Sequence, residues 1–237
     1  MMQVASEVAS GRQAIGELVV TSRPLSEYRD MFTLSEVDLL AGPILDCPGG
    51  ASPFGAQVRA RGGSCVSVDP AYALAPDELA RRVGSDIEHA SGWMSDHPAN
   101  FDWSYMGTPA AFTRSFELAA ELFLTDYRPD GRRYVAASLP ALPFDDDSFR
   151  LGLCSHLLFC YPEYLTYAEH LASMLELVRV TSDEVRIYPL VDTAGMPYPR
   201  MEELRADLAE CGVVTEVRRA RSSYVIGSDS LLVCRGE

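Results

Sequence analysis

Short apolar runs alternate with longer amphipathic stretches along most of the chain. Runs such as residues 44–47, 65–68 and 231–234 consist mostly of apolar side chains, which is typical of strands buried on both faces of a sheet. The stretches between such runs repeat apolar residues at intervals of three and four, as helices do. The alternation predicts an α/β fold with a mainly parallel sheet and helices on both of its faces.

The predicted elements follow from this alternation. Strands are expected over residues 44–47, 65–68, 134–137, 151–155, 185–190, 213–218 and 231–234. Helices are expected over residues 54–61, 75–90, 112–127, 164–178 and 201–211. Residues 91–109 are expected to be irregular and contain both tryptophans, so this aromatic stretch is either a lid over a substrate or ordinary packing between helices.

The chain is expected to form one α/β domain that follows a short extension. Residues 1–43 are predicted to be a helical N-terminal extension, because apolar residues recur between Tyr28 and Leu40 at loosely helical spacing. Residues 44–237 would form the domain, with a helical and aromatic insertion at about residues 75–130. A length of 237 residues fits this single-domain interpretation.

The charge of the chain bears on its partners. The 34 acidic residues against 20 basic ones give a formal net charge of -14, which repels phosphate backbones and anionic lipids. We therefore expect no nucleic-acid partner and no membrane partner. Every basic residue is arginine, so mechanisms that need a Schiff-base lysine or the lysine of a phosphate-binding loop are excluded.

The cysteines and the N-terminal sequence favour a cytoplasmic protein. The six cysteines form no CxxC pair and lie mostly in apolar runs, as buried free thiols do. The N-terminus lacks the basic start and apolar stretch of a signal peptide, and no run reaches the roughly 18 apolar residues that span a bilayer. We expect a monomer or a homodimer that acts on a small molecule.

A glycine turn and an acidic residue follow the first two predicted strands. The turn Asp46-Cys47-Pro48-Gly49-Gly50-Ala51-Ser52 lets the backbone approach a bulky ligand, and the helix start behind it favours a negative group. Asp69 ends the next strand and can accept hydrogen bonds from both hydroxyls of a ribose. In a parallel sheet both features lie at the ligand-binding edge, so the pattern predicts a nucleoside-containing ligand.

Two classes of cofactor fit such a unit, namely dinucleotides and S-adenosylmethionine. The segment GGASPFG does not follow the G-x-G-x-x-G spacing of dinucleotide sites. An acid at the position of Asp46 would repel a pyrophosphate, whereas it could hold an ammonium group. These details favour S-adenosylmethionine.

Several segments resemble the motifs of class I S-adenosylmethionine-dependent methyltransferases. Residues 44–50 with residues 68–70 resemble motif I and the acidic motif that follows it, and residues 138–149 with 153–159 resemble a later conserved block. Residues 176–180 followed by 184–186 resemble a third segment, so the likeness covers residues 44–234. The resemblance implies a Rossmann-like, doubly wound, mainly parallel sheet of seven strands.

The resemblance also implies positions for the cofactor. Residues matched to the family motifs would border the methionine part (Asp46, Gly49, Gly50, Ser52), the ribose hydroxyls (Asp69), the adenine (Ala71, Tyr72, Ser138, Leu139) and the sulfonium with the substrate (Cys154, Ser155, His156). The family usually carries glycine two, four and six places after its first acid. This chain has Pro48, Gly50 and Ser52 there, so only the middle glycine is present.

Methyl transfer depends mainly on positioning, so few side chains are obligatory. His156 is the best candidate for a general base, because it follows a strand at the ligand-binding edge; the alternative is a packed, hydrogen-bonded histidine. Asp192 is a second candidate at the same edge, and otherwise a turn residue. No spacing of histidine, cysteine and acidic residues matches a metal site.

Together these features predict an enzyme, a methyltransferase that passes a methyl group from S-adenosylmethionine to a small-molecule acceptor. The altered glycine motif motivates an alternative, a related protein that has lost catalysis and serves as a partner or regulatory subunit. A nicotinamide-dependent oxidoreductase is a further alternative, because it would use the same strand-turn-helix-strand unit.

Overall fold

A seven-stranded sheet forms the centre of the protein in this computed structural model, which describes residues 14–16, 18–222 and 224–236. The strands are β1 (Pro43–Asp46), β2 (Ser64–Val68), β3 (Tyr134–Val135), β4 (Phe149–Ser155), β5 (Thr181–Tyr188), β6 (Val213–Arg219) and β7 (Ser230–Gly236). Their order across the sheet is β3-β2-β1-β4-β5-β7-β6. The predicted α/β fold with a mostly parallel sheet is confirmed.

One strand breaks the parallel arrangement. β7 pairs antiparallel with both of its neighbours, β5 and β6, while all other pairs are parallel. β6 and β7 are joined by a connection of ten residues, 220–229, whose described residues form no helix. Such a direct connection between neighbouring strands returns the chain in the opposite direction, whereas a parallel pair needs a longer crossover.

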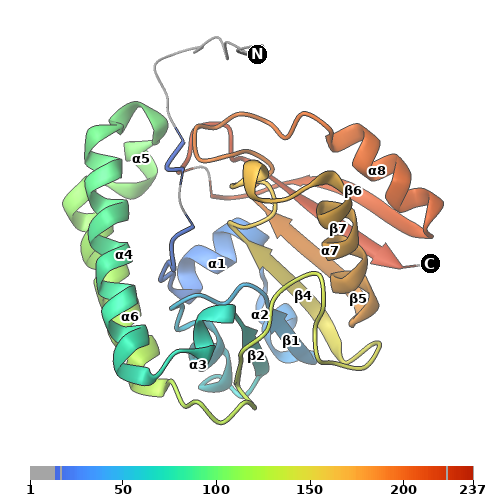
Figure 1. Cartoon of the computed structure of the whole chain (residues 1–237), viewed down its shortest axis with the longest axis horizontal. Helices are drawn as coiled ribbons and strands as arrows, with labels where there is room; N and C mark the ends of the chain where they lie inside the picture. The colour runs from blue at the N-terminus through green and yellow to red at the C-terminus, as the bar shows by residue number, and fades with distance from the viewer. Residues whose placement is uncertain (1–13, 17, 223, 237) are drawn as a thin grey trace.

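Helices cover both faces of the sheet. They are α1 (Leu25–Phe32), α2 (Glu36–Leu40), α3 (Phe54–Arg59), α4 (Pro76–Asp96), α5 (Trp103–Met106), α6 (Pro109–Asp126), α7 (Tyr167–Arg179) and α8 (Met201–Glu210). Along β1, Ile44 packs with α1 to α3 and Leu45 packs with α7 and α8, as the alternation of side chains in a strand requires. Figure 1 shows α4 and α6 side by side at one end of the molecule and α8 near the other.

The N-terminal segment differs from its predicted form. Helices occupy only α1 and α2, and residues 18–24 have no regular structure; residues 1–13 of the predicted extension lie outside the described part. The run Val19-Val20-Thr21 is β-branched, which disfavours a helix, and Pro24 allows one to begin only after it. We call residues 18–24 the strap, because they cross the carboxyl edge of the sheet on their way to α1.

The predicted insertion is mostly helical. α4 continues to Asp96, six residues beyond its predicted end, and the stretch that was expected to be irregular holds the end of α4, a short 3-10 helix (Pro98–Asn100) and α5. α4 packs against α6. Among the described residues, no helix is both long enough and apolar enough to cross a membrane.

Candidate functional site

A cavity of about 460 Å³ lies at the carboxyl ends of β1, β2 and β4. Its volume falls within the range of roughly 300 to 1,000 Å³ that is usual for small-ligand sites. The glycine turn after β1, Asp69 after β2 and His156 after β4 all line it, and the strap forms part of its wall. This is the edge at which parallel α/β sheets bind their ligands.

The two glycines of the turn are required by close packing. A Cβ atom at Gly50 would lie 2.6 Å from the carbonyl oxygen of Thr21 in the strap, and Gly50 also has a positive φ of 51°. A Cβ atom at Gly49 would lie 2.6 Å from the hydroxyl of Tyr72 and 2.7 Å from Cβ of Ser67. The turn therefore exposes bare backbone to the cavity and is held tightly from behind.

Asp69 connects the turn to the segment after β2. Its Oδ2 accepts a hydrogen bond from the backbone N–H of Gly50 at 3.0 Å, and its Oδ1 accepts one from the N–H of Ala71 at 2.9 Å. Burial raises the pKa of this carboxyl, although the two N–H donors oppose the effect. Each oxygen retains a free acceptor direction, so the carboxylate can also accept hydrogen bonds from ligand hydroxyls.

Asp46 lies behind the turn and does not line the cavity. Its Oδ1 accepts a hydrogen bond from the hydroxyl of Tyr28 at 2.9 Å, and its Oδ2 accepts one from Ser67 at 3.1 Å. The side chain is fully buried, and this burial raises its pKa to about 7. In this position the carboxyl supports the turn, and a direct contact with a ligand remains a prediction.

The cavity brings together most of the other residues proposed for the cofactor. Those that line it are Gly49, Gly50, Ser52, Asp69, Ala71, Ser138, Leu139, Ser155 and His156. Tyr72 and Cys154 do not line it. The Tyr72 hydroxyl donates to the carbonyl of Gly50 at 2.7 Å, while Cys154 is fully buried, which raises the pKa of its thiol to about 12.

The strap supplies cavity-lining residues that the sequence did not reveal. Its carbonyl at Thr21 accepts a hydrogen bond from the N–H of Ala51 at 2.9 Å, and the N–H of Val20 donates to Oδ2 of Asp86 in α4 at 2.7 Å. Arg23 from the same segment also lines the cavity. The strap carries no motif, and only an unusual run of β-branched residues before Pro24 distinguishes it in the sequence.

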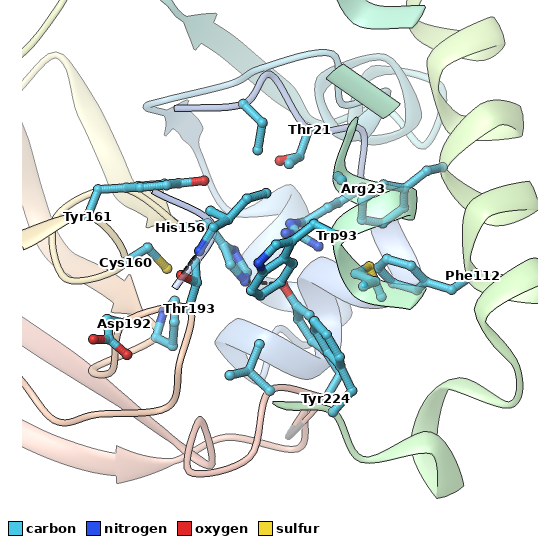
Figure 2. Close-up of a pocket in the computed structure, with 18 residues that line it drawn as sticks. Thr21, Arg23, Trp93, Phe112, His156, Cys160, Tyr161, Asp192, Thr193 and Tyr224 are labelled. Atoms are coloured by element: carbon cyan, nitrogen blue, oxygen red, sulfur yellow. Dashed lines mark hydrogen bonds between the residues drawn. The ribbon is translucent and has the colours of Figure 1, made fainter. Parts of the chain in front are cut away.

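A second, smaller cavity of about 60 Å³ adjoins the first (Figure 2). The two cavities share five lining residues, namely Val19, Thr21, Arg23, His156 and Tyr161. Aromatic side chains from five separate segments make up much of the small cavity, among them Trp93, Phe101, Phe112, Phe116, Tyr161 and Tyr224. The aromatic insertion thus forms one side of this cavity and packs against the strap.

His156 stands between the two cavities. It has a positive φ of 51°, an uncommon conformation for a non-glycine residue, and its N–H donates to the carbonyl of Tyr188 at 2.8 Å. Its ring Nε2 lies 2.6 Å from the hydroxyl oxygen of Tyr224. Burial, together with the guanidinium of Arg23, lowers the pKa of His156 well below its usual value, so the imidazole is neutral near pH 7.

Asp192 lines only the smaller of the two cavities and is held in a turn. Its Oδ1 accepts hydrogen bonds from the N–H groups of Ala194 at 2.9 Å and Met196 at 2.8 Å. In Figure 2 its carboxylate lies at the margin of the cluster, turned away from the centre. The arrangement fits the turn interpretation, and its part in catalysis remains a prediction.

Metal ligands do not cluster in the part of the chain that the structure describes. No group of three or more histidine, cysteine, aspartate or glutamate side chains there could hold a metal ion. The chemistry that the site can offer comes from its shape, the backbone of the turn, the Asp69 carboxylate, the Arg23 guanidinium and the neutral His156 ring.

Comparison with known proteins gives one relative at substantial identity. The chain is 32% identical over 183 residues to the uncharacterized protein MJ0045 of Methanocaldococcus jannaschii, and the alignment covers 76% of this chain and 80% of that protein. No protein-family model matches the chain.

Solved structures resemble the chain at low identity. The magnesium protoporphyrin IX methyltransferase ChlM from Synechocystis PCC 6803 with bound S-adenosylmethionine is 12% identical and aligns over 90% of this chain and 78% of its own, with a TM-score of 0.48. TnmH is 15% identical over 90% of this chain, with a TM-score of 0.44. The chain covers 55% of TnmH, about half its length.

Proposed function

The chain belongs to the protein family of the uncharacterized protein MJ0045 of Methanocaldococcus jannaschii, and we propose that it is an S-adenosylmethionine-dependent methyltransferase with a small-molecule acceptor. One observation carries the proposal. A tightly held glycine turn and the Asp69 carboxylate border a 460 Å³ cavity at the carboxyl edge of the sheet, and that cavity adjoins a second, aromatic one. Two adjoining spaces suit a reaction between two ligands.

The residues that line the larger cavity fit the nucleoside half of the cofactor. Asp69 presents carboxylate oxygens that can accept hydrogen bonds from the two ribose hydroxyls. Leu74 and Leu139 add apolar surface that can cover an adenine ring, and Ser138 lies beside Leu139. Ala71, whose N–H is already bonded to Asp69, would lie at the adenine side of the ribose.

The turn and the strand end after β4 fit the remainder of the cofactor. Gly49, Gly50 and Ser52 bring the turn close to the methionine part. Ser155 lines the larger cavity beside His156, which borders both cavities. When bound, S-adenosylmethionine supplies a methyl group on a positively charged sulfur. The net charge of -14 and the carboxylate of Asp69 favour a cationic ligand.

The chain contributes to the reaction mainly by positioning. Holding the acceptor in the smaller cavity and the cofactor in the larger one would place the two reacting atoms at the junction, near His156. The neutral His156 ring can hydrogen-bond an acceptor there, or take a proton from it as a base. Its lowered pKa makes it a weak base, so we propose hydrogen bonding as its main part.

The proposal is tested by transfer of a labelled methyl group. Purified protein, S-adenosylmethionine labelled on its methyl group and a fractionated extract of small metabolites should give a labelled product. The same incubation with Asp69→Ala should give none, because the ribose hydroxyls lose their charged acceptor. Labelled product formed equally well by both proteins would contradict the assignment of Asp69.

A further inference from the structure

We propose that the smaller cavity holds a short alkyl group of the methyl acceptor, two or three carbons long, and that the nucleophilic atom of the acceptor faces the cofactor in the larger cavity. The inference rests on the proposed function, because it names the class of acceptor for the same site. The acceptor group is defined by its polarity, its length and its direction, and each follows from a different feature of the cavity.

Carbon atoms form almost the whole wall of the smaller cavity (Figure 2). Ala90, Trp93 and Met94 come from α4, and Phe112 and Phe116 come from α6. The ring centroids of Phe112 and Phe116 lie 4.1 Å apart, so the two rings hold each other in place. Burial of an alkyl group against such a surface removes apolar area from water and stabilises the complex.

Arg23, the cationic side chain of the wall, is occupied by other parts of the protein. Its Nη1 donates to Glu27 at 2.7 Å, and its guanidinium lies over the rings of Phe116 and Tyr224, 5.1 Å and 5.2 Å from their centroids. Its Nε is buried and presents no surface to the cavity. The hydroxyl oxygen of Tyr224 lies 2.6 Å from Nε2 of His156, so these two groups bond to each other. A charged acceptor group would therefore find no partner among them.

Other polar groups of the wall are also engaged. Oδ1 of Asp192 accepts from two N–H groups of its own turn, and Oγ1 of Thr193 accepts from the N–H of Ile15 at 2.9 Å. Nε1 of Trp93 and Nδ1 of His156 have no partner among the described residues, but both atoms are buried and present no surface to a ligand. A polar end group would lose its hydrogen bonds to water without replacement, so the cavity favours an alkyl group.

The volume of the cavity sets the length of this group. A cavity of roughly 150 Å³ in an engineered protein core holds the six carbons of benzene, which is about 25 Å³ for each carbon. The smaller cavity has about 60 Å³, so two or three carbons fill it. Ala90 has the smallest side chain in its wall and Met94 a flexible one, so these two positions control the space.

The direction of the acceptor follows from the residues that the two cavities share. Val19, Thr21 and His156 are among those that border both spaces, so they lie at the junction. An alkyl group in the smaller cavity leaves the heteroatom attached to it at this junction, on the side of the cofactor. The nucleophilic atom then lies where near-attack positioning requires it, and the apolar end points away from the larger cavity.

A series of alkanethiols of increasing length tests the proposal on the whole protein. Protein saturated with S-adenosylhomocysteine is titrated with ethanethiol, 1-propanethiol, 1-butanethiol and 1-hexanethiol, and the indole N–H signal of Trp93 is followed by nuclear magnetic resonance. Trp103 is the other tryptophan of the chain, so Trp103→Phe identifies this signal. We expect the affinity to rise about fourfold from ethanethiol to 1-propanethiol and to rise no further for the longer thiols.

2-Mercaptoethanol is the matched polar probe, because a hydroxyl replaces the terminal methyl group of 1-propanethiol. It should bind roughly tenfold more weakly than 1-propanethiol, since its hydroxyl finds no partner in the cavity. Equal affinity for these two probes would overturn the inference. So would an affinity that rises steadily to 1-hexanethiol, or a Trp93 signal that no thiol shifts.

Two variants change the space in opposite directions. Ala90→Leu fills the cavity and should weaken binding of 1-propanethiol roughly tenfold, whereas Met94→Ala enlarges it and should make 1-butanethiol bind more tightly than 1-propanethiol. Ala111→Leu is the matched control, because it adds the same side chain at an exposed position of α6 that lines neither cavity. It should keep the wild-type order of affinities. Unchanged binding of 1-propanethiol in Ala90→Leu would place the alkyl group elsewhere and overturn the inference.

The two proposals fail in different ways. If the folded wild-type protein does not bind S-adenosylhomocysteine, the proposed function itself fails. If it binds S-adenosylhomocysteine but does not distinguish the thiols, only the acceptor assignment fails. Should Ala90→Leu not fold, as judged by circular dichroism, the thiol series on the wild-type protein and on Met94→Ala decides.

Discussion

The hydroxyl oxygen of Tyr224 lies 2.6 Å from Nε2 of His156. Burial raises the pKa of Tyr224 well above 10, so its hydroxyl keeps its proton and can donate to the neutral imidazole. Tyr224→Phe removes this hydroxyl, so Nε2 of His156 loses its hydrogen-bond donor and the imidazole ring can rotate. We predict that the rate of labelled methyl transfer to the acceptor found in the metabolite extract falls about tenfold, as expected for a net hydrogen bond of about 1.4 kcal/mol, while the affinity for S-adenosylhomocysteine stays unchanged.

Tyr188→Phe is the matched control for this variant. Tyr188 also contacts the His156 ring, edge to face at 5.4 Å between centroids, but its hydroxyl donates to Ser228 at 2.9 Å and not to His156. The control should retain the wild-type rate below its unfolding temperature. An equal loss of rate in both variants would show that general packing, and not the Tyr224 hydroxyl, positions His156.

His156 should make the protein less stable in mild acid. Its pKa is lowered well below 6.5 by burial, so below pH 6.5 the unfolded chain binds a proton here that the folded protein does not. The free energy of unfolding therefore falls as the pH falls, by up to about 1.4 kcal/mol per pH unit. In His156→Asn, whose side chain tolerates the positive φ, denaturant titrations at pH 7 and pH 5 should differ less than in the wild type.

Leu122→Asn provides the comparison, because Leu122 is an exposed residue of α6 without a titratable group. It should show the same loss of stability between pH 7 and pH 5 as the wild type. If His156→Asn also loses as much stability as the wild type, the imidazole is not kept neutral by the fold, and its lowered pKa is refuted.

Asp46 should have the opposite pH dependence. Burial raises its pKa to about 7 from 3.8, so between these values the folded protein holds a proton that the unfolded chain releases. Its contribution to stability is complete at low pH and is lost as the pH rises to about 7. In Asp46→Asn the amide can still accept from Tyr28 and donate to Ser67. Relative to the wild type, we predict that this variant gains about 3 kcal/mol of unfolding free energy between pH 4 and pH 7.

Urea unfolding curves of Asp46→Asn and of the wild type, recorded at intervals of half a pH unit between pH 4 and pH 7, test this prediction. Leu118→Asn, at an exposed position of α6 without a titratable group, serves as the control and should show the same pH dependence of unfolding free energy as the wild type. A constant difference between Asp46→Asn and the wild type over this range would mean that Asp46 is ionised in the folded protein.

The strap should respond to the cofactor. The N–H of Val20 donates to Asp86, and residues 18–21 border the larger cavity, so a ligand there would cover this segment. We predict that saturating S-adenosylhomocysteine slows amide hydrogen exchange of residues 18–21 at least tenfold relative to the free protein. The exposed edge strand β6 should exchange at the same rate with and without the ligand. Unchanged exchange in the strap would place the ligand elsewhere.

The sequence allowed the sheet and the turn to be predicted because both depend on local patterns. Buried apolar runs specify strands, and the turn that starts at Asp46 needs glycines wherever its backbone is crowded. The reversal of β7 was not predicted, because apolar runs do not carry direction. Asp46 was expected at the ligand, but Tyr28 and Ser67, which hold it behind the turn, come from segments that no local pattern connects to it.

The smaller cavity could not be predicted for the same reason. Its lining residues come from the strap, α4, α6 and the loops that follow β4, β5 and β6, and they meet only in the folded protein. The sequence shows the aromatic stretch but not the cavity that it lines. Arg23, a further lining residue, looks like an ordinary surface arginine in the sequence, whereas in the structure it is buried with its guanidinium over the rings of Phe116 and Tyr224.

Binding of a nucleoside cofactor in the larger cavity depends on Asp69 in the function proposed above. Calorimetric titration of the folded protein with S-adenosylhomocysteine tests it most directly, with Asp69→Ala and the exposed control Asp183→Asn measured alongside. We predict one binding site in the wild type and in the control. Removing the Asp69 carboxylate should lower the affinity about a hundredfold, which corresponds to a loss of about 2.7 kcal/mol of binding free energy. No binding to the well-folded wild-type protein, or equal affinity in Asp69→Ala, would contradict it.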